Sequence, residues 1–245
     1  SNSCVITNEE GWYKKALDTD LARPKFAIMN PEITYTLPDY QTQCGCADIM
    51  MHTMERYFVL EDTMEITDKI AQDVMKNVMK YAKILKKDPE NYEARAEIMW
   101  CGSLSHNGLT GCGTCGGDWA THLIEHELGG MFDVAHGAGL AAVWGSWARY
   151  VMDEKPERFA QFAVDVMGVE ESDDVKSTAL KGIEAVEEFY RMIEMPTNMK
   201  ELGIDPTDEQ IKDMAMKATN HDTQQLGAFK KLSAKDLVEI YKTAK

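Results

Sequence analysis

Two clusters of possible metal ligands stand out in the sequence. Asp48 and His52 are four residues apart, as are His122 and His126, and His136 follows in the next part of the chain. Residues four apart on a helix project from one face, so each pair can point at a single ion. Three imidazoles with a carboxylate suit iron, zinc, nickel or manganese better than an all-oxygen calcium or magnesium site. Four of the 6 histidines in 245 residues lie in these clusters, which argues against chance.

The second cluster also fits a different chemistry. From His122 to His126 the sequence reads H-x-x-E-H, the pattern of inverted zinc metallopeptidases, in which both histidines bind zinc and the glutamate, here Glu125, activates water. The pattern is short and arises readily on an amphipathic helix. A zinc-dependent hydrolase therefore stays open as an alternative.

Composition limits the partners and the location. The formal net charge of -15 argues against a nucleic-acid partner, because a phosphate backbone would be repelled. The sequence shows no stretch typical of a membrane span and no signal peptide. Without a signal peptide, the 6 cysteines favour a reducing compartment over a disulfide framework. We expect a cytoplasmic protein with no membrane partner.

The elements that must position these side chains are mostly helices. Short apolar runs at residues 4–7 and 26–29 predict two strands, which could pair across the polar segment between them. After Pro38 the apolar spacing becomes helical. It predicts helices over residues 43–59, 65–86, 91–105, about 118–128, 136 to beyond 150, 156–167, 174–193, 208–218 and 234–243. The predicted fold is a mainly α helical bundle with a short N-terminal β segment.

Single residues refine this prediction. Asp118 is expected to cap the helix that carries His122, and Gly129-Gly130 is expected to end it. Glu125 has two open interpretations, as a hydrogen-bond partner of a ligand imidazole or as an exposed helical acid. Cys112 and Cys115 have zinc-knuckle or redox spacing, but no second pair accompanies them, so a structural or incidental role is expected.

The wider pattern around both clusters resembles one family. Residues 42–57 read T-x-x-G-x-x-D-x-x-x-H-x-x-E-x-Y, and residues 118–137 read D-W-A-x-H-x-x-x-H-x-L-G-G-x-x-D-x-x-H-G. With these motifs the sequence resembles the iron-containing (group III) alcohol dehydrogenases, particularly their butanol-dehydrogenase branch. The resemblance covers the whole chain and includes Asn30-Pro31-Glu32, Leu37-Pro38 and Leu202-Gly203-Ile204.

The resemblance implies a role for each residue of the clusters. Asp48, His52, His122 and His136 match the family's metal ligands for Fe²⁺, or for Zn²⁺ or another divalent ion. His126 matches a catalytic histidine that positions substrate or transfers a proton. A metal with four protein ligands still needs open space for an alcohol oxygen, which fits this division. The implied reaction interconverts small primary alcohols and aldehydes, with hydride passing to or from NAD or NADP.

The resemblance also implies a domain arrangement. Residues 41–245 would form the family's all-helical metal-binding domain, like the C-terminal domain of dehydroquinate synthase. Residues 1–40 would be a β-containing connecting segment from an α/β nucleotide-binding domain, whose glycine-rich loop is not found in these residues. We therefore expect the isolated chain to bind a divalent metal but to show little dehydrogenase activity, and the whole enzyme to be a homodimer. A non-catalytic helical metal-binding module is a further alternative.

Overall fold

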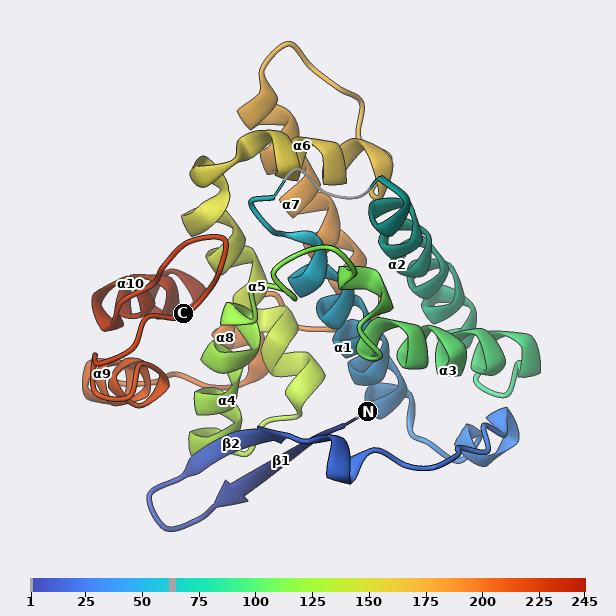
Figure 1. The fold of residues 1–245 in the computed structure, drawn as a ribbon, viewed down its shortest axis with the longest axis horizontal. Helices are drawn as coiled ribbons and strands as arrows, with labels where there is room; N and C mark the ends of the chain where they lie inside the picture. Colours follow the sequence, from blue (N-terminus) through green and yellow to red (C-terminus); the bar gives the residue numbers. More distant parts are fainter. Residues whose placement is uncertain (1, 62–64) are drawn as a thin grey trace.

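The structure, a computed structural model, describes residues 2–61 and 65–245. The described residues form a helical bundle with one two-stranded antiparallel hairpin at its N-terminal end (Figure 1), which confirms the predicted fold class. The elements are β1 (Ser3–Asn8), β2 (Tyr13–Asp18), α1 (Asp39–Tyr57), α2 (Glu65–Leu85), α3 (Tyr92–His106), α4 (Ala120–Phe132), α5 (His136–Val151), α6 (Pro156–Asp165), α7 (Val175–Met192), α8 (Met199–Leu202), α9 (Asp208–Ala218) and α10 (Ala234–Ala244), with short 3₁₀ turns between some of them.

Helices α1 and α5 lie at the centre of the bundle and pack against each other. Figure 1 shows α2 and α3 on one side of this pair, α9 and α10 on the other, and α6 beyond one end, with α7 running from that end into the bundle, where it packs on α5. The core between them is made of large apolar side chains, including Met50, Met54 and Trp144, each at most 1% exposed. Phe58 stacks on Phe159 with ring centroids 4.3 Å apart. This buried core fixes α1 and α5, which carry three of the four candidate metal ligands, Asp48 and His52 on α1 and His136 on α5.

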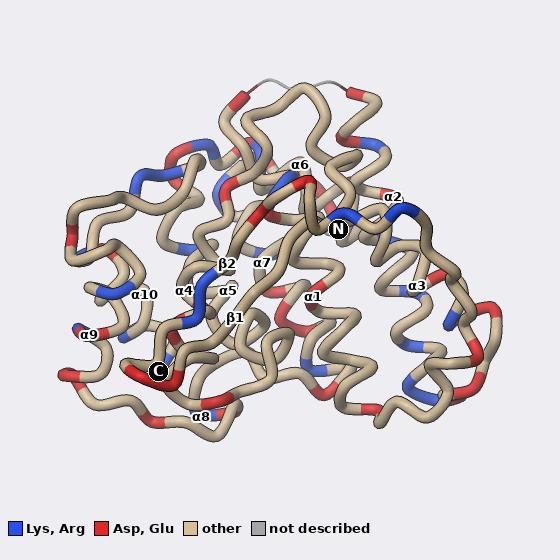
Figure 2. Tube along the Cα trace, turned by 60° about the horizontal axis from the view of Figure 1, so that its bottom comes forward, with Lys and Arg blue, Asp and Glu red and all other residues tan. Residues whose placement is uncertain are grey.

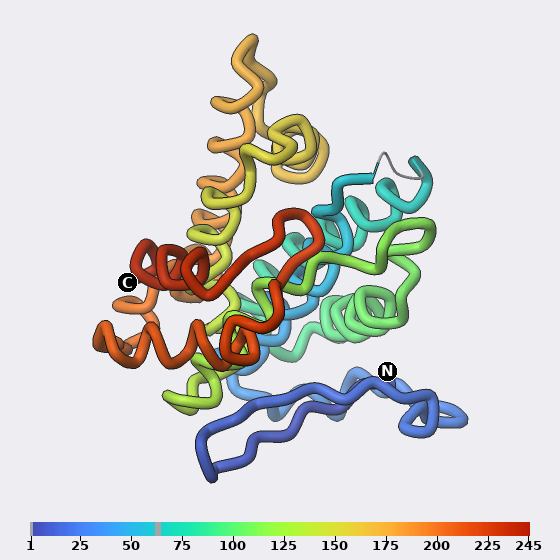
Figure 3. The backbone as a smooth tube through the Cα atoms, turned by 60° about the vertical axis from the view of Figure 1, so that its left-hand side comes forward, coloured from blue at the N-terminus to red at the C-terminus, as the bar shows by residue number. Residues whose placement is uncertain are grey.

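The N-terminal strands differ from the sequence prediction. β1 contains the predicted run at residues 4–7, but it pairs with β2 in the register Ser3↔Asp18 to Asn8↔Tyr13. Residues 26–29 form no strand, and the side chain of Ile28 is 85% exposed. The second strand was missed because its sequence, YKKALD, shows no apolar alternation. Figure 3 shows this hairpin lying along one side of the helical body.

Helix α4 also extends beyond its predicted end. Gly129 and Gly130 lie inside it, and it ends at Phe132, where the next residue, Asp133, adopts a left-handed φ of 53°. A Cβ at Gly130 would lie 2.7 Å from the carbonyl oxygen of Trp12. The glycines therefore do not terminate the helix; Gly130 lets the hairpin backbone approach it closely.

The loop before α4 is tied to the C-terminal part of the chain by Asp118. Its Oδ2 accepts a hydrogen bond from the amide of Ala120, the first residue of α4, at 3.1 Å, but the N-cap residue is Trp119 and not Asp118 as predicted. Its Oδ1 accepts from the amides of Ala228 and Phe229, both at 2.6 Å. One side chain thus fixes the start of α4 and the turn that precedes α10.

Asp and Glu residues are spread along the whole Cα trace, whereas Lys14 and Lys15 form a basic stretch on β2 (Figure 2). In the described part of the chain, no helix is long and apolar enough to cross a membrane.

Candidate metal centre

The four predicted metal ligands come from three helices and meet around one carboxylate oxygen. Asp48 and His52 lie on α1, His122 lies on α4, and His136 is the first residue of α5. Asp48 Oδ1 lies 3.6 Å from His52 Nε2, 3.5 Å from His122 Nε2 and 3.6 Å from His136 Nε2. Ligand atoms of Asp48, His122 and His136 all lie within 4.8 Å of one another. His52 is outside that closest group, and its ring stacks on that of His122 with centroids 4.7 Å apart.

The donor atoms at this point fit a divalent cation. Asp48 Oδ1 and His122 Nε2 are buried, and neither has a hydrogen-bond partner among the described residues. Buried polar atoms without a protein partner are rare, and they are typical of places where an ion or a water molecule binds. One carboxylate oxygen facing three imidazole nitrogens is a donor set for iron, zinc or a similar ion. The residues present therefore fit the metal that the sequence implies.

Glu55 fixes the orientation of His122. Its Oε1 accepts from the His122 backbone amide at 3.0 Å and lies 3.1 Å from His122 Nδ1. Because Nδ1 carries the proton in that hydrogen bond, the lone pair of Nε2 is directed at Asp48. Burial alone lowers the pKa of His122, but the nearby carboxylates of Asp48 and Glu55 outweigh it and raise the pKa to about 9. The surroundings of this imidazole thus favour a positive charge, whether a proton or a metal ion.

Glu125 orients His136 as Glu55 orients His122. Its Oε2 contacts His136 Nδ1, and its side chain is fully buried. Lys14, from β2, places its ammonium 3.2 Å from Glu125 Oε2 and 3.4 Å from His136 Nδ1. Of the two interpretations of Glu125, the geometry favours the hydrogen-bond partner, because an exposed helical acid would not be buried.

His126 lies one turn along α4 from His122 and is turned toward α5. Its ring centroid lies 5.7 Å from that of His136, and its side chain is buried. Burial and the neighbouring His136 lower the pKa of His126 to about 3. It is therefore a neutral imidazole near neutral pH, with one nitrogen to donate and the other to accept a hydrogen bond.

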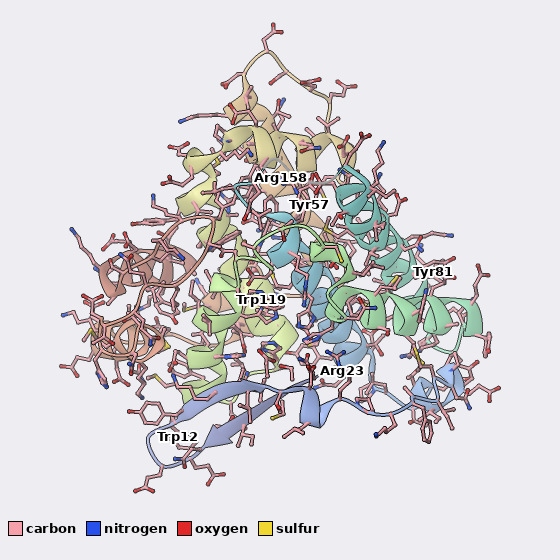
Figure 4. All side chains as sticks on the ribbon, in the orientation of Figure 1. Trp12, Arg23, Tyr57, Tyr81, Trp119 and Arg158 are labelled. Carbon is pink, nitrogen blue, oxygen red and sulfur yellow. The ribbon has the colours of Figure 1, made fainter. Side chains whose placement is uncertain are left out.

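Two aromatic side chains, His106 and Trp119, complete the surroundings of His52. The ring of His106, at the end of α3, meets His52 edge-on with centroids 4.3 Å apart. Trp119 lies with its ring centroid 5.2 Å from that of His122 and 6.1 Å from that of His52 (Figure 4). His106 has no spacing that relates it to the ligands, so only the packing of α3 places it here, whereas Trp119 lies three residues before His122 in the sequence.

Cys112 and Cys115 do not belong to the groups of ligand atoms gathered here. Cys112 and Cys115 are exposed free thiols in the loop before α4.

The helical bundle with this candidate metal centre defines the class of domain, and the comparison with known families identifies the family. The sequence profile described as "Fe-containing alcohol dehydrogenase family, C-terminal" matches residues 42–245. The chain therefore belongs to the Fe-containing alcohol dehydrogenase family, over the C-terminal part of that family.

Individual relatives point the same way. The chain is 34% identical to NADH-dependent butanol dehydrogenase A of Clostridium acetobutylicum, over 97% of this chain and 61% of that protein. It is 35% identical to the probable NADH-dependent butanol dehydrogenase 1 of Bacillus subtilis, over 100% of this chain and 62% of the relative. The crystal structure of NADH-dependent butanol dehydrogenase A from Thermotoga maritima superposes with a TM-score of 0.92 at 34% identity, covering 99% of this chain and 62% of that one. The chain thus spans less than two thirds of the length of these relatives.

Proposed function

We propose that this chain supplies the metal centre of a nicotinamide-dependent alcohol dehydrogenase that interconverts small primary alcohols and aldehydes. The observation that carries this proposal is the meeting of Asp48 Oδ1 with three imidazole nitrogens at 3.5 to 3.6 Å. The relatives support the reaction class, because they include NADH-dependent butanol dehydrogenases and the NADPH-dependent aldehyde reductase YqhD of Escherichia coli.

In this proposal Asp48, His52, His122 and His136 hold the divalent metal, Fe²⁺ or Zn²⁺. When bound, the metal supplies a Lewis acid that stabilises negative charge on the substrate oxygen during hydride transfer. Glu55 and the helix packing hold the imidazoles in place before any ligand arrives, which reduces the reorganisation that binding requires.

His126 is proposed to act on the substrate and not as a ligand. Its ring is neutral near neutral pH, because burial keeps its pKa low. A neutral imidazole accepts the hydroxyl proton at one nitrogen while donating from the other, so it suits a relay of protons better than a resident acid. This position on α4, one turn beyond His122, places it beside the centre without adding a fifth ligand.

The domain boundaries are part of the proposal. Residues 41–245 form the metal-binding domain, in line with the family match that begins at residue 42. Residues 1–40 connect it to a nucleotide-binding domain that holds NAD or NADP, and the whole enzyme forms a homodimer. Hydride transfer needs donor and acceptor carbons about 3 to 3.5 Å apart, so the cofactor must be held at this centre by that second domain.

The hydrolase alternative is not favoured by the geometry. It requires His122 and His126 to bind one ion while Glu125 activates water. His122 instead groups with Asp48 and His136, whereas His126 groups with Glu125 and His136. Glu125 is fully buried and engaged by Lys14 and His136, so it is not free to act on a water molecule.

The proposal is tested by joining residues 1–245 to the nucleotide-binding part of a butanol dehydrogenase relative and loading the product with Fe²⁺. We expect oxidation of NADH or NADPH with butanal, abolished by Asp48→Ala, and little activity from residues 1–245 alone. An inactive fusion that binds both metal and nucleotide would contradict the proposed reaction, and so would robust activity that survives Asp48→Ala. An inactive fusion that binds metal would also fit the non-catalytic module.

A further inference from the structure

A second group of metal-ligating side chains lies beside the proposed centre. Ligand atoms of Glu125, His126 and His136 all lie within 4.8 Å of one another. Two imidazoles and a carboxylate are the donor set of many catalytic zinc sites, in which zinc lies about 2.0 to 2.2 Å from each ligand. Glu125 Oε2 already contacts His136 Nδ1, so an ion between them would part this pair and draw His126 toward it.

The space at this group is filled by a cation from the hairpin. The ammonium of Lys14 lies 3.4 Å from Glu125 Oε1, 3.2 Å from Glu125 Oε2 and 3.4 Å from His136 Nδ1. The side chain of Lys14 is 14% exposed and that of Glu125 is fully buried. A buried carboxylate requires a compensating charge, and this ammonium is the cation that contacts it in the described structure.

The helices are shaped to admit this lysine. A Cβ at Gly129 would lie 2.6 Å from Lys14 Nζ and 2.9 Å from Glu125 Oε1. A Cβ at Gly139, on α5, would lie 2.8 Å from Glu125 Cγ. Two glycines on different helices thus leave the room in which the buried ion pair forms, so the pocket is a built feature of the fold.

We propose that Lys14 occupies a second cation site made by Glu125, His126 and His136, and that removal of its ammonium opens this site to a divalent metal. The inference rests on the proposed function for the identity of the neighbouring centre. In the folded protein Lys14 directs the metal to the side of His136 that faces Asp48. The hairpin therefore determines which of two adjacent donor groups binds the ion.

The test removes the proposed centre first and then the ammonium. The background variant is Asp48→Ala/His122→Ala, with Lys14→Met added to it, and the probe is Zn²⁺ alone, measured as zinc per chain after gel filtration. We expect no bound zinc in the background and one zinc per chain after Lys14→Met. Lys15→Met is the matched control, because Lys15 is the next residue of the same strand, projects from its other face and is exposed. It should add no zinc.

The outcome separates this inference from the proposed function. Zinc binding by the Lys14→Met variant supports the second site. It does so even if the unmodified chain binds no zinc, a result that would count against the proposed function alone. The inference is overturned if Lys14→Met adds no zinc, or if Lys15→Met adds as much. Circular dichroism reports whether each variant is folded, and Asp48→Asn serves as the background if the double substitution does not fold.

Discussion

Replacement of Gly137 by alanine should damage the metal centre without touching a ligand. Gly137 follows His136 at the start of α5, and a Cβ there would lie 2.0 Å from the carbonyl oxygen of Cys44 and 2.6 Å from its carbonyl carbon. Cβ atoms essentially never come within 3.0 Å of such atoms, so α5 and α1 must separate by about 1 Å. The backbone of Cys44 cannot rotate away from the new methyl group as a side chain could. His136 would therefore move away from Asp48.

The magnitude follows from that displacement. Metal sites tolerate only about 0.2 Å of error in ligand distance, so a shift of about 1 Å should weaken Zn²⁺ binding by at least about tenfold. Overpacking of a tight helix contact should also lower the free energy of unfolding by about 1 to 3 kcal/mol. Competition with a chromophoric chelator measures the first effect, and urea unfolding of the metal-free protein measures the second.

Gly45→Ala is the control for this substitution. Gly45 lies on α1, next to Cys44 in the sequence, but a Cβ there would meet nothing within 4 Å. An exposed alanine in place of a helical glycine should leave zinc affinity unchanged and add up to about 1 kcal/mol of stability. Unchanged affinity and stability in Gly137→Ala would refute the close approach of the two helices.

Three further substitutions test other parts of the structure. Glu55→Gln should weaken zinc binding by about 10- to 100-fold, since it removes the carboxylate that orients a ligand imidazole, whereas exposed Glu188→Gln should not. Burial raises the pKa of Glu127 to about 7, above its ordinary value of 4.5, so the stability it contributes below pH 4.5 is lost as the pH rises to 7. Glu127→Gln should therefore be more stable than the unmodified protein above pH 7, by up to about 3 kcal/mol, with no advantage near pH 4 in urea unfolding. Arg158→Met should cost about 3 to 5 kcal/mol in the same assay, because the buried guanidinium bonds Asp68 at 2.6 and 2.7 Å; a cost below 1 kcal/mol would contradict that role.

The helical part of the fold was predictable because its apolar spacing is regular. The predicted helix over residues 208–218 matches α9, and the other long helices begin or end within a few residues of their predicted bounds. The spacing failed where a tertiary contact decides the conformation. Gly129 and Gly130 are helix terminators by local preference, but packing of the hairpin on α4 overrides that preference.

The candidate metal centre was also predictable in part. The i,i+4 spacing placed Asp48 with His52 on one helix face, and the structure places them 3.6 Å apart at their closest atoms. His106 and Lys14 could not be found from the sequence, because nothing but the packing of α3 and of the hairpin brings them to the ligands. The spacing of residues can thus indicate a pair of ligands on one helix, but it carries no information on which distant helix or strand supplies the other residues of the site.

The measurement that tests the account most directly is the metal content of four single variants of residues 1–245 after loading with Zn²⁺ and gel filtration. We predict one ion per chain in the unmodified protein and in His126→Ala, and loss of that ion in Asp48→Ala, His122→Ala and His136→Ala. Loss of the ion in His126→Ala with retention in Asp48→Ala would contradict the proposed ligand set and would support the hydrolase pattern instead.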